Sequence, residues 1–153
     1  MNWNLIWKPI DAYTSEFIVF LGDEPIITKK MFADIIRTPK NLYLTFVESS
    51  YKFSFELFNE FICEFESGKQ TKFVFDINDG EEAFAYDSDM ESLKIVFQLY
   101  SSNLNISIPM DERTRMQFAN EFRKFLTHNM NLYEESTKLI TDDSSYQTEI
   151  SPI

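Results

Sequence analysis

The sequence contains few of the residues on which recognisable catalytic and metal sites depend. There are one cysteine, one histidine and only three glycines in 153 residues. A single cysteine excludes a disulfide within the chain, and with one histidine it cannot complete the ligand set of a structural zinc site. The glycines Gly22, Gly68 and Gly80 are isolated, whereas a P-loop or a dinucleotide-binding motif needs them at short fixed spacing. We therefore expect no metal, no cofactor and no catalytic residues.

Basic residues and long apolar runs are also scarce. The chain has 14 Lys and Arg against 25 Asp and Glu, which gives a formal net charge of −11. This charge opposes direct binding to nucleic acid or to an anionic membrane, because both are polyanions. No window approaches the ~18 consecutive apolar residues of a membrane span, and residues 1–9 lack a basic leader. With the single cysteine, these features predict a cytoplasmic protein.

Apolar residues, in contrast, are sufficient for a substantial core. Hydrophobic residues make up 44% of the chain and aromatic residues 16%, and 16 residues are Phe. This composition predicts one globular α+β domain over residues 1–133. From residue 134 the sequence becomes polar and acidic and loses any sustained period, so we expect residues 134–153 to form an acidic, disordered tail.

Alternation of apolar and polar residues predicts an antiparallel sheet. The predicted strands cover residues 16–21, 41–47, 70–77, 82–87, 93–99 and 104–108. Asp79-Gly80, between the third and fourth of these strands, favours a two-residue hairpin turn, because glycine tolerates the positive φ that this turn needs. The last four strands are therefore expected to form an up-and-down meander.

A first short helix is predicted over residues 29–37. Thr28 is a suitable N-cap, because its hydroxyl can accept a hydrogen bond from a free N–H group of the first turn. Phe32, Ile35 and Ile36 then recur at helical spacing. These two signals together favour a helix between the first two strands.

Residues 51–67 are ambiguous between strand and helix. Apolar residues alternate at the start of the segment, as they would in a strand. From Phe58 to Phe65 they recur instead at i, i+3, i+4 and i+7, which is the stripe of an amphipathic helix. Gly68 follows where a left-handed glycine commonly ends a helix. We favour a second short helix over about residues 55–67.

The clearest helix covers about residues 111–130. Asp111 is the expected N-cap, and Glu112 places a negative charge in the first turn, where the helix dipole favours it. The apolar stripe of this helix consists of Phe118, Ala119, Phe122, Phe125 and Leu126. The only histidine, His128, would lie on the last turn, so a capping or surface role is expected rather than general-base catalysis.

Three further residues attract attention because of their type. Cys63 lies inside the predicted second helix, where a lone cysteine usually behaves as a small hydrophobic residue. Trp3 and Trp7 are expected to pack under the sheet, although tryptophans near a terminus can also anchor an interface.

A crowd of acidic residues on one predicted hairpin and its next connection is the main candidate site. Its members are Asp76, Asp79, Glu81, Glu82, Asp87, Asp89 and Glu91. They do not fit a calcium loop, because with Gly80 at the sixth position the first ligand would be Phe75. The crowd is interpreted either as an acidic surface for a basic protein partner or as a charged edge that prevents aggregation.

The order of a four-strand meander and a capped amphipathic helix in a small acidic chain resembles that of bacterial immunity proteins and phage-encoded inhibitors. The resemblance is one of layout alone. We expect a non-enzymatic protein that binds a partner with a basic surface, most simply as an inhibitor. Two alternatives stay open: an assembly subunit that forms a homo-oligomer, and a small-molecule-binding protein with a cavity between sheet and helix.

Overall fold

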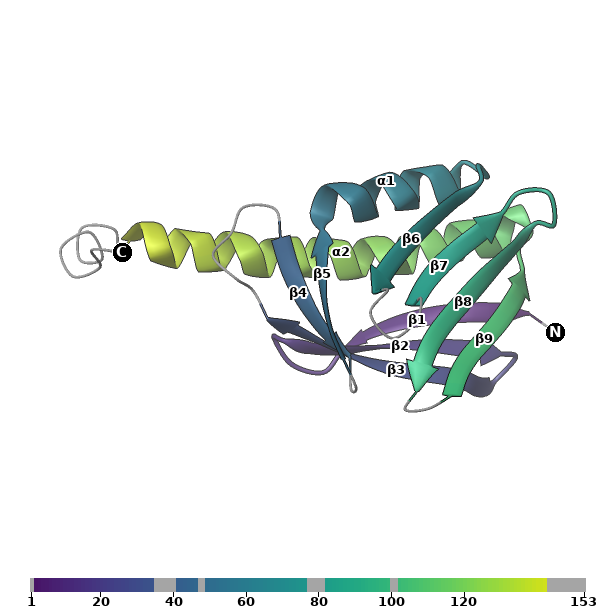
Figure 1. Ribbon diagram of the computed structural model, residues 1–153, viewed down its shortest axis with the longest axis horizontal. Helices are drawn as coiled ribbons and strands as arrows, with labels where there is room; N and C mark the ends of the chain where they lie inside the picture. The colour runs from purple at the N-terminus through teal and green to yellow at the C-terminus, as the bar shows by residue number, and fades with distance from the viewer. Residues whose placement is uncertain (1, 35–40, 47–48, 77–81, 100–101, 143–153) are drawn as a thin grey trace.

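The computed structural model describes residues 2–34, 41–46, 49–76, 82–99 and 102–142. These residues form two antiparallel sheets, with strand orders β1-β2-β3-β4-β5 and β6-β7-β8-β9, and two helices (Figure 1). The elements are β1 (Trp3–Pro9), β2 (Thr14–Leu21), β3 (Glu24–Asp34), β4 (Asn41–Phe46), β5 (Ser49–Ser54), α1 (Phe55–Glu66), β6 (Thr71–Asp76), β7 (Glu82–Asp87), β8 (Ser92–Leu99), β9 (Ser102–Pro109) and α2 (Glu112–Asp142). The predicted α+β class and the C-terminal four-strand meander are confirmed.

Both sheets and both helices contribute to one aromatic core. Phe122 of α2 is 1% exposed and lies at its centre. Its ring centroid is between 4.9 and 6.0 Å from those of Phe17, Phe58, Phe61, Phe65 and Phe84. These five rings come from β2, α1 and β7, so α2 joins the first sheet, the short helix and the second sheet. Among the described residues, aromatic rings occupy the space where α2, α1, β2 and β7 meet.

The prediction of a helix over residues 29–37 is wrong. Residues as far as Asp34 belong to β3, and residues 35–37 lie outside the described residues. This strand is paired on both sides, because Met31 is the register partner of Ser15 in β2 and of Phe46 in β4. Its buried residues alternate at 27, 29 and 31, as a strand requires. Pairing on two sides therefore outweighs the local helical spacing.

The ambiguous segment 51–67 contains both a strand and a helix. Its first residues belong to β5, and α1 begins directly afterwards at Phe55, as the apolar stripe predicts. Gly68 ends α1 with φ 79°, which is the left-handed region that glycine tolerates best. The N–H group of Gly68 donates to the carbonyl of Phe65 at 3.0 Å, and that of Lys69 donates to Glu64 at 2.9 Å. This pair of bonds is a Schellman motif, and the predicted helix over 55–67 is confirmed.

Helix α2 begins as predicted but ends later. The N–H group of Thr114 donates to Asp111 Oδ1 at 2.8 Å, so Asp111 is the N-cap. The side chain and the N–H group of Thr114 bond to this carboxylate and lower its pKa. The helix continues past residue 130 to Asp142, so residues 134–142 of the expected tail are helical. Residues 143–153 lie outside the described residues, and the division into domain and tail stays a prediction.

One face of α2 covers the outer edge of β1 with polar side chains. Gln117 Oε1 accepts the N–H group of Leu5 at 2.9 Å, and Gln117 Nε2 donates to the carbonyl of Leu5 at 2.6 Å. One helical turn later, Glu121 Oε1 accepts the N–H group of Trp7 at 3.0 Å. A strand edge otherwise exposes such groups to pairing with other chains. The two side chains occupy the place that a neighbouring strand would take.

His128 and Trp7 extend this contact between α2 and the N-terminal segment. His128 Nε2 lies 3.0 Å from the carbonyl oxygen of Ala12, and the His128 and Trp7 ring centroids are 5.2 Å apart. Because α2 runs on to Asp142, His128 is not on its last turn, so the capping part of the expected capping or surface role is wrong. Trp3 and Trp7 both pack against the core, as predicted.

Candidate functional site

The structure places five of the seven predicted acidic residues, and it divides these five between the two ends of β7. Asp76 and Glu82 are register partners at one end, where β6 and β7 meet. Asp87 ends β7 at the other end and is followed by Asp89 and Glu91. The remaining two, at positions 79 and 81, lie outside the described residues. The five placed residues thus lie in two groups, and the predicted site stays a prediction. Among these five, the structure describes the side chains of Asp87, Asp89 and Glu91, in the turn at residues 87–91.

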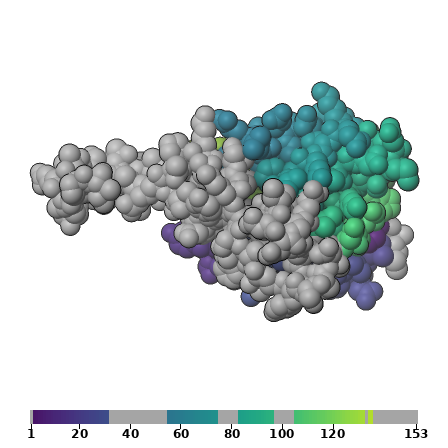
Figure 2. All heavy atoms as spheres, in the orientation of Figure 1, coloured from purple at the N-terminus to yellow at the C-terminus, as the bar shows by residue number. Residues whose placement is uncertain are grey.

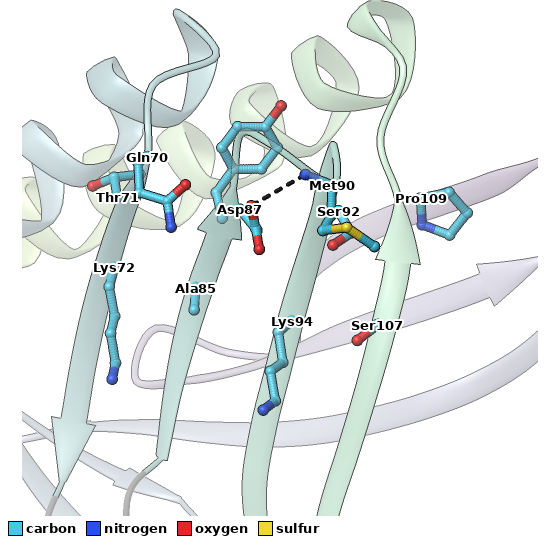
Figure 3. Close-up of a pocket in the computed structure, with 11 residues that line it drawn as sticks. Gln70, Thr71, Lys72, Ala85, Asp87, Met90, Ser92, Lys94, Ser107 and Pro109 are labelled. Carbon is cyan, nitrogen blue, oxygen red and sulfur yellow. Dashed lines mark hydrogen bonds between the residues drawn. The ribbon is translucent and has the colours of Figure 1, made fainter.

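Asp87 organises this turn from within. Its Oδ1 atom accepts the N–H group of Asp89 at 2.9 Å. The same atom accepts the N–H group of Met90 at 3.1 Å (Figure 3). Aspartate commonly stabilises turns in this way, because its short side chain reaches backbone groups a few residues ahead. The Asp87 carboxylate therefore stabilises the turn. The sequence analysis interprets the same carboxylate as part of a partner-binding surface.

Bonds from outside the turn fix its position on the sheet. Gln70 Oε1 accepts the N–H group of Ser88 at 2.8 Å and the Ser88 hydroxyl at 3.1 Å. At the far end, Glu91 has a φ of 47°, and its carbonyl accepts the N–H group of Met110 at 2.8 Å. A residue other than glycine persists in this left-handed region only where its surroundings hold it. The turn is thus restrained at its start and at its end.

The restrained turn presents an apolar side chain between two carboxylates. Met90 is 74% exposed, the largest exposure among the described large hydrophobic residues. Asp89 and Glu91, on either side of it in the chain, are also exposed. The acidic neighbours were candidates from the sequence, whereas Met90 was not. The signal that could have identified it is a lone methionine in a polar connection between two strands.

Beside the turn, the outer face of the second sheet carries a groove with a volume of about 630 Å³ (Figure 3). One row of register partners crosses it from β6 to β9 in the order Lys72, Ala85, Lys94 and Ser107. The same strands direct Phe73, Phe84, Leu93 and Ile95 into the core on the opposite face. Figure 2 shows α1 and the second sheet at the surface on the same side of the molecule. Sequence reasoning identified neither lysine as part of a site.

Cys63 lies on α1 near an ion pair that joins α1 to α2. Cys63 is exposed on α1. Its Sγ atom lies 3.9 Å from Arg123 Nη2. The same guanidinium forms an ion pair with Glu66, whose Oε1 atom accepts from Nη2 at 3.0 Å. Hydrogen bonding to Glu66 raises the pKa of Arg123. Within the described residues, no three His, Cys, Asp or Glu side chains are placed to hold a metal ion.

Comparisons with known proteins add no relative to this picture. No family model, curated protein or solved structure matches the chain. In the described part of the chain, neither helix combines the length and apolar character needed to cross a membrane. Function is therefore inferred from the geometry and charge of the chain's own side chains.

Proposed function

We propose that this protein binds a protein partner through the turn at residues 87–91 and thereby covers a basic site on that partner. The observation that supports this proposal best is the exposure of Met90 between Asp89 and Glu91 in a turn restrained by hydrogen bonds. The partner surface that fits is an apolar pocket surrounded by lysine or arginine side chains.

The apolar part of this contact would supply most of the binding free energy. Interfaces concentrate their affinity in a few side chains that fill pockets, surrounded by polar contacts that exclude water. Methionine suits this role because its unbranched, polarisable side chain adapts to the shape of a pocket. A turn that Asp87 already holds in place loses little conformational entropy on binding, which favours affinity further.

The acidic part would govern the rate and specificity of association. With a net charge of −11, the protein attracts basic surfaces over a range set by the ionic strength. Asp89 and Glu91 place two of these charges next to the apolar anchor. Complementary charges at a rim raise the association rate constant and discriminate against acidic partners more than they raise affinity.

The test combines partner capture with matched variants. Capture from the native host followed by mass spectrometry identifies the partner, and surface plasmon resonance on the purified pair then gives Kd and rate constants. Met90→Ala is expected to weaken binding by about 30-fold, mainly through faster dissociation, which corresponds to a hot-spot loss of about 2 kcal/mol. Met116→Ala is the control, since Met116 is 40% exposed on α2 and distant in sequence from the turn.

Neutralising Asp89 and Glu91, the two acidic residues beside Met90, tests the electrostatic part of the proposal. The double variant Asp89→Asn and Glu91→Gln is expected to slow association and to reduce its dependence on salt, with little change in the dissociation rate. If a captured partner bound the Met90→Ala protein and the double variant with unchanged kinetics, the turn would not be the binding surface and the proposal would be wrong.

A further inference from the structure

The outer face of the second sheet has a groove because its central positions carry small side chains. Ala85 is an outward position of β7 and lines the groove between its neighbours from β6 and β8. Methyl groups in the middle of a sheet leave a depression between longer side chains on either side. The volume of about 630 Å³ lies within the range of pockets that hold small organic molecules.

Two lysines border this depression at the same level. Lys72 of β6 and Lys94 of β8 are both register partners of Ala85, and their side chains extend in the same direction along the sheet (Figure 3). Adjacent strands are about 4.8 Å apart, so the two backbones are separated by about 10 Å. Flexible lysine side chains can therefore bring both ammonium groups to one anion placed over Ala85.

A role in preventing aggregation does not explain both lysines. Lysine on an edge strand discourages pairing with other chains, and this argument applies to Lys72 because β6 is an edge of its sheet. Lys94 lies on β8, which is paired with β7 on one side and β9 on the other. Its presence beside the groove in a chain with an excess of acidic residues needs another reason.

The other side chains of the groove make its two ends differ in charge. Ser107 continues the lysine row on β9, where its hydroxyl can donate to a bound anion. Asp87 and Ser92 are register partners in the next outward row, close to the turn. A carboxylate at that end repels an anionic group, so the negative end of a ligand is favoured at the lysines. A neutral or positively charged donor is favoured near Asp87.

We infer that this groove binds a small molecule with a carboxylate or phosphate group, which Lys72 and Lys94 hold over Ala85 while a hydrogen-bond donor of the ligand faces Asp87. The groove adjoins the proposed partner surface, because Met90 and Asp87 of the turn also line it. The inference rests on the lysine row and does not depend on the proposed partner binding. It assigns a ligand class to the outer face of a sheet whose inner face forms the core.

The experiment is a titration of the full chain with two probes, inorganic pyrophosphate and succinate, at constant ionic strength. Amide chemical shifts are followed by NMR. Saturable shifts are expected at Ala85, Lys94 and Ser107 with at least one probe, and the probe that binds more tightly distinguishes phosphate from carboxylate recognition. Lys94→Gln is expected to weaken binding by about tenfold or more, since it removes one of two charges from the anion.

Two further variants separate a built site from general charge attraction. Ala85→Leu fills the depression without changing any charge and is expected to abolish binding, whereas Lys69→Gln removes an exposed lysine outside the groove and is expected to leave it unchanged. Well-dispersed spectra of each variant show that it is folded. Absence of saturable shifts at millimolar probe would overturn the inference. Equal binding by the Ala85→Leu and unmodified proteins would do so as well.

Discussion

Helix α2 contacts its two sets of neighbours by different physical means. Toward α1 and the second sheet it presents buried rings, with Phe122 at the centre of the aromatic core. Toward β1 it adds to a ring contact between Phe125 and Trp7 the polar side chains Gln117 and Glu121, which bond to backbone groups of the strand. Apolar burial is not directional and supplies most of the stabilising free energy. The polar contacts are directional, and they determine which residue of β1 lies beside which turn of the helix.

This difference shows how the core and the polar contacts together fix the register of a strand against the helix. A strand that slips by one residue turns its buried side chains toward solvent. In β1, Leu5 is 2% exposed and is the residue whose N–H and carbonyl groups both bond to Gln117. The side-chain amide thus selects the register that also buries Leu5. The two kinds of contact therefore favour the same register.

The largest expected effect comes from the apolar side. Phe122→Ala should lower the free energy of unfolding by about 3–5 kcal/mol, because it leaves a cavity among rings that come from three elements. Urea denaturation followed by tryptophan fluorescence measures the change. Met116→Ala on the same helix is the control, with an expected change within about 0.5 kcal/mol. A loss below 1 kcal/mol for Phe122→Ala would contradict the central position of this ring.

An intermediate effect is expected on the polar side. Gln117→Ala should cost about 1–3 kcal/mol, since it leaves the N–H and carbonyl groups of Leu5 without their partner at a partly buried site. Hydrogen exchange of the Leu5 amide should accelerate more than exchange in the core of the second sheet. Thr127→Ala, at an exposed position of α2, is the control. Uniform acceleration across both sheets would show that the bond does not act locally on β1.

The smallest effect tests a polar contact on the apolar side of the helix. Arg123→Met removes the ion pair with Glu66 but retains most of the side-chain packing. Because the two side chains are 36% and 28% exposed, the pair should contribute less than about 1 kcal/mol, and its contribution should shrink in high salt. Thermal denaturation at two salt concentrations measures both quantities. A salt-independent loss above 2 kcal/mol would contradict this expectation, because the pair would then stabilise the fold as strongly as the contacts of Gln117.

Local patterns predicted those elements whose signals agree with their surroundings. The stripe from Phe58 to Phe65 and the following Gly68 identify α1, and alternation identifies the meander. The failure at β3 has a clear reason. Lys29 is 3% exposed at a position where alternation leads one to expect an apolar residue, so it interrupts the strand pattern, and the local spacing favours a helix. Its two-sided pairing depends on residues far along the chain, which local spacing does not reveal.

The candidate site was predictable only in part. Acidic residues around the turn are visible in the sequence, but their division between the ends of β7 follows from the strand pairing. The lysine row depends on the registers of three strand pairs, which the predicted meander did not specify. The contact between Gln117 and Leu5 spans 112 positions, so no local pattern could indicate it. Side chains that act across strands or between distant segments are therefore the part that needs the structure.

The late end of α2 has a mechanical consequence. The side chains of Phe125, Leu126 and Asn129 are buried, whereas Met130 and Asn131 are exposed, and the helix then continues to Asp142 beyond the sheets (Figure 1). At about 1.5 Å per residue, the stretch from residue 130 to residue 142 is about 18 Å long. Such a stretch works as a lever arm. When α2 tilts against β1, the displacement at Asp142 is larger than the displacement where the helix contacts the strand. A spin label placed at Asp142 would therefore magnify motions of the helix on its sheet.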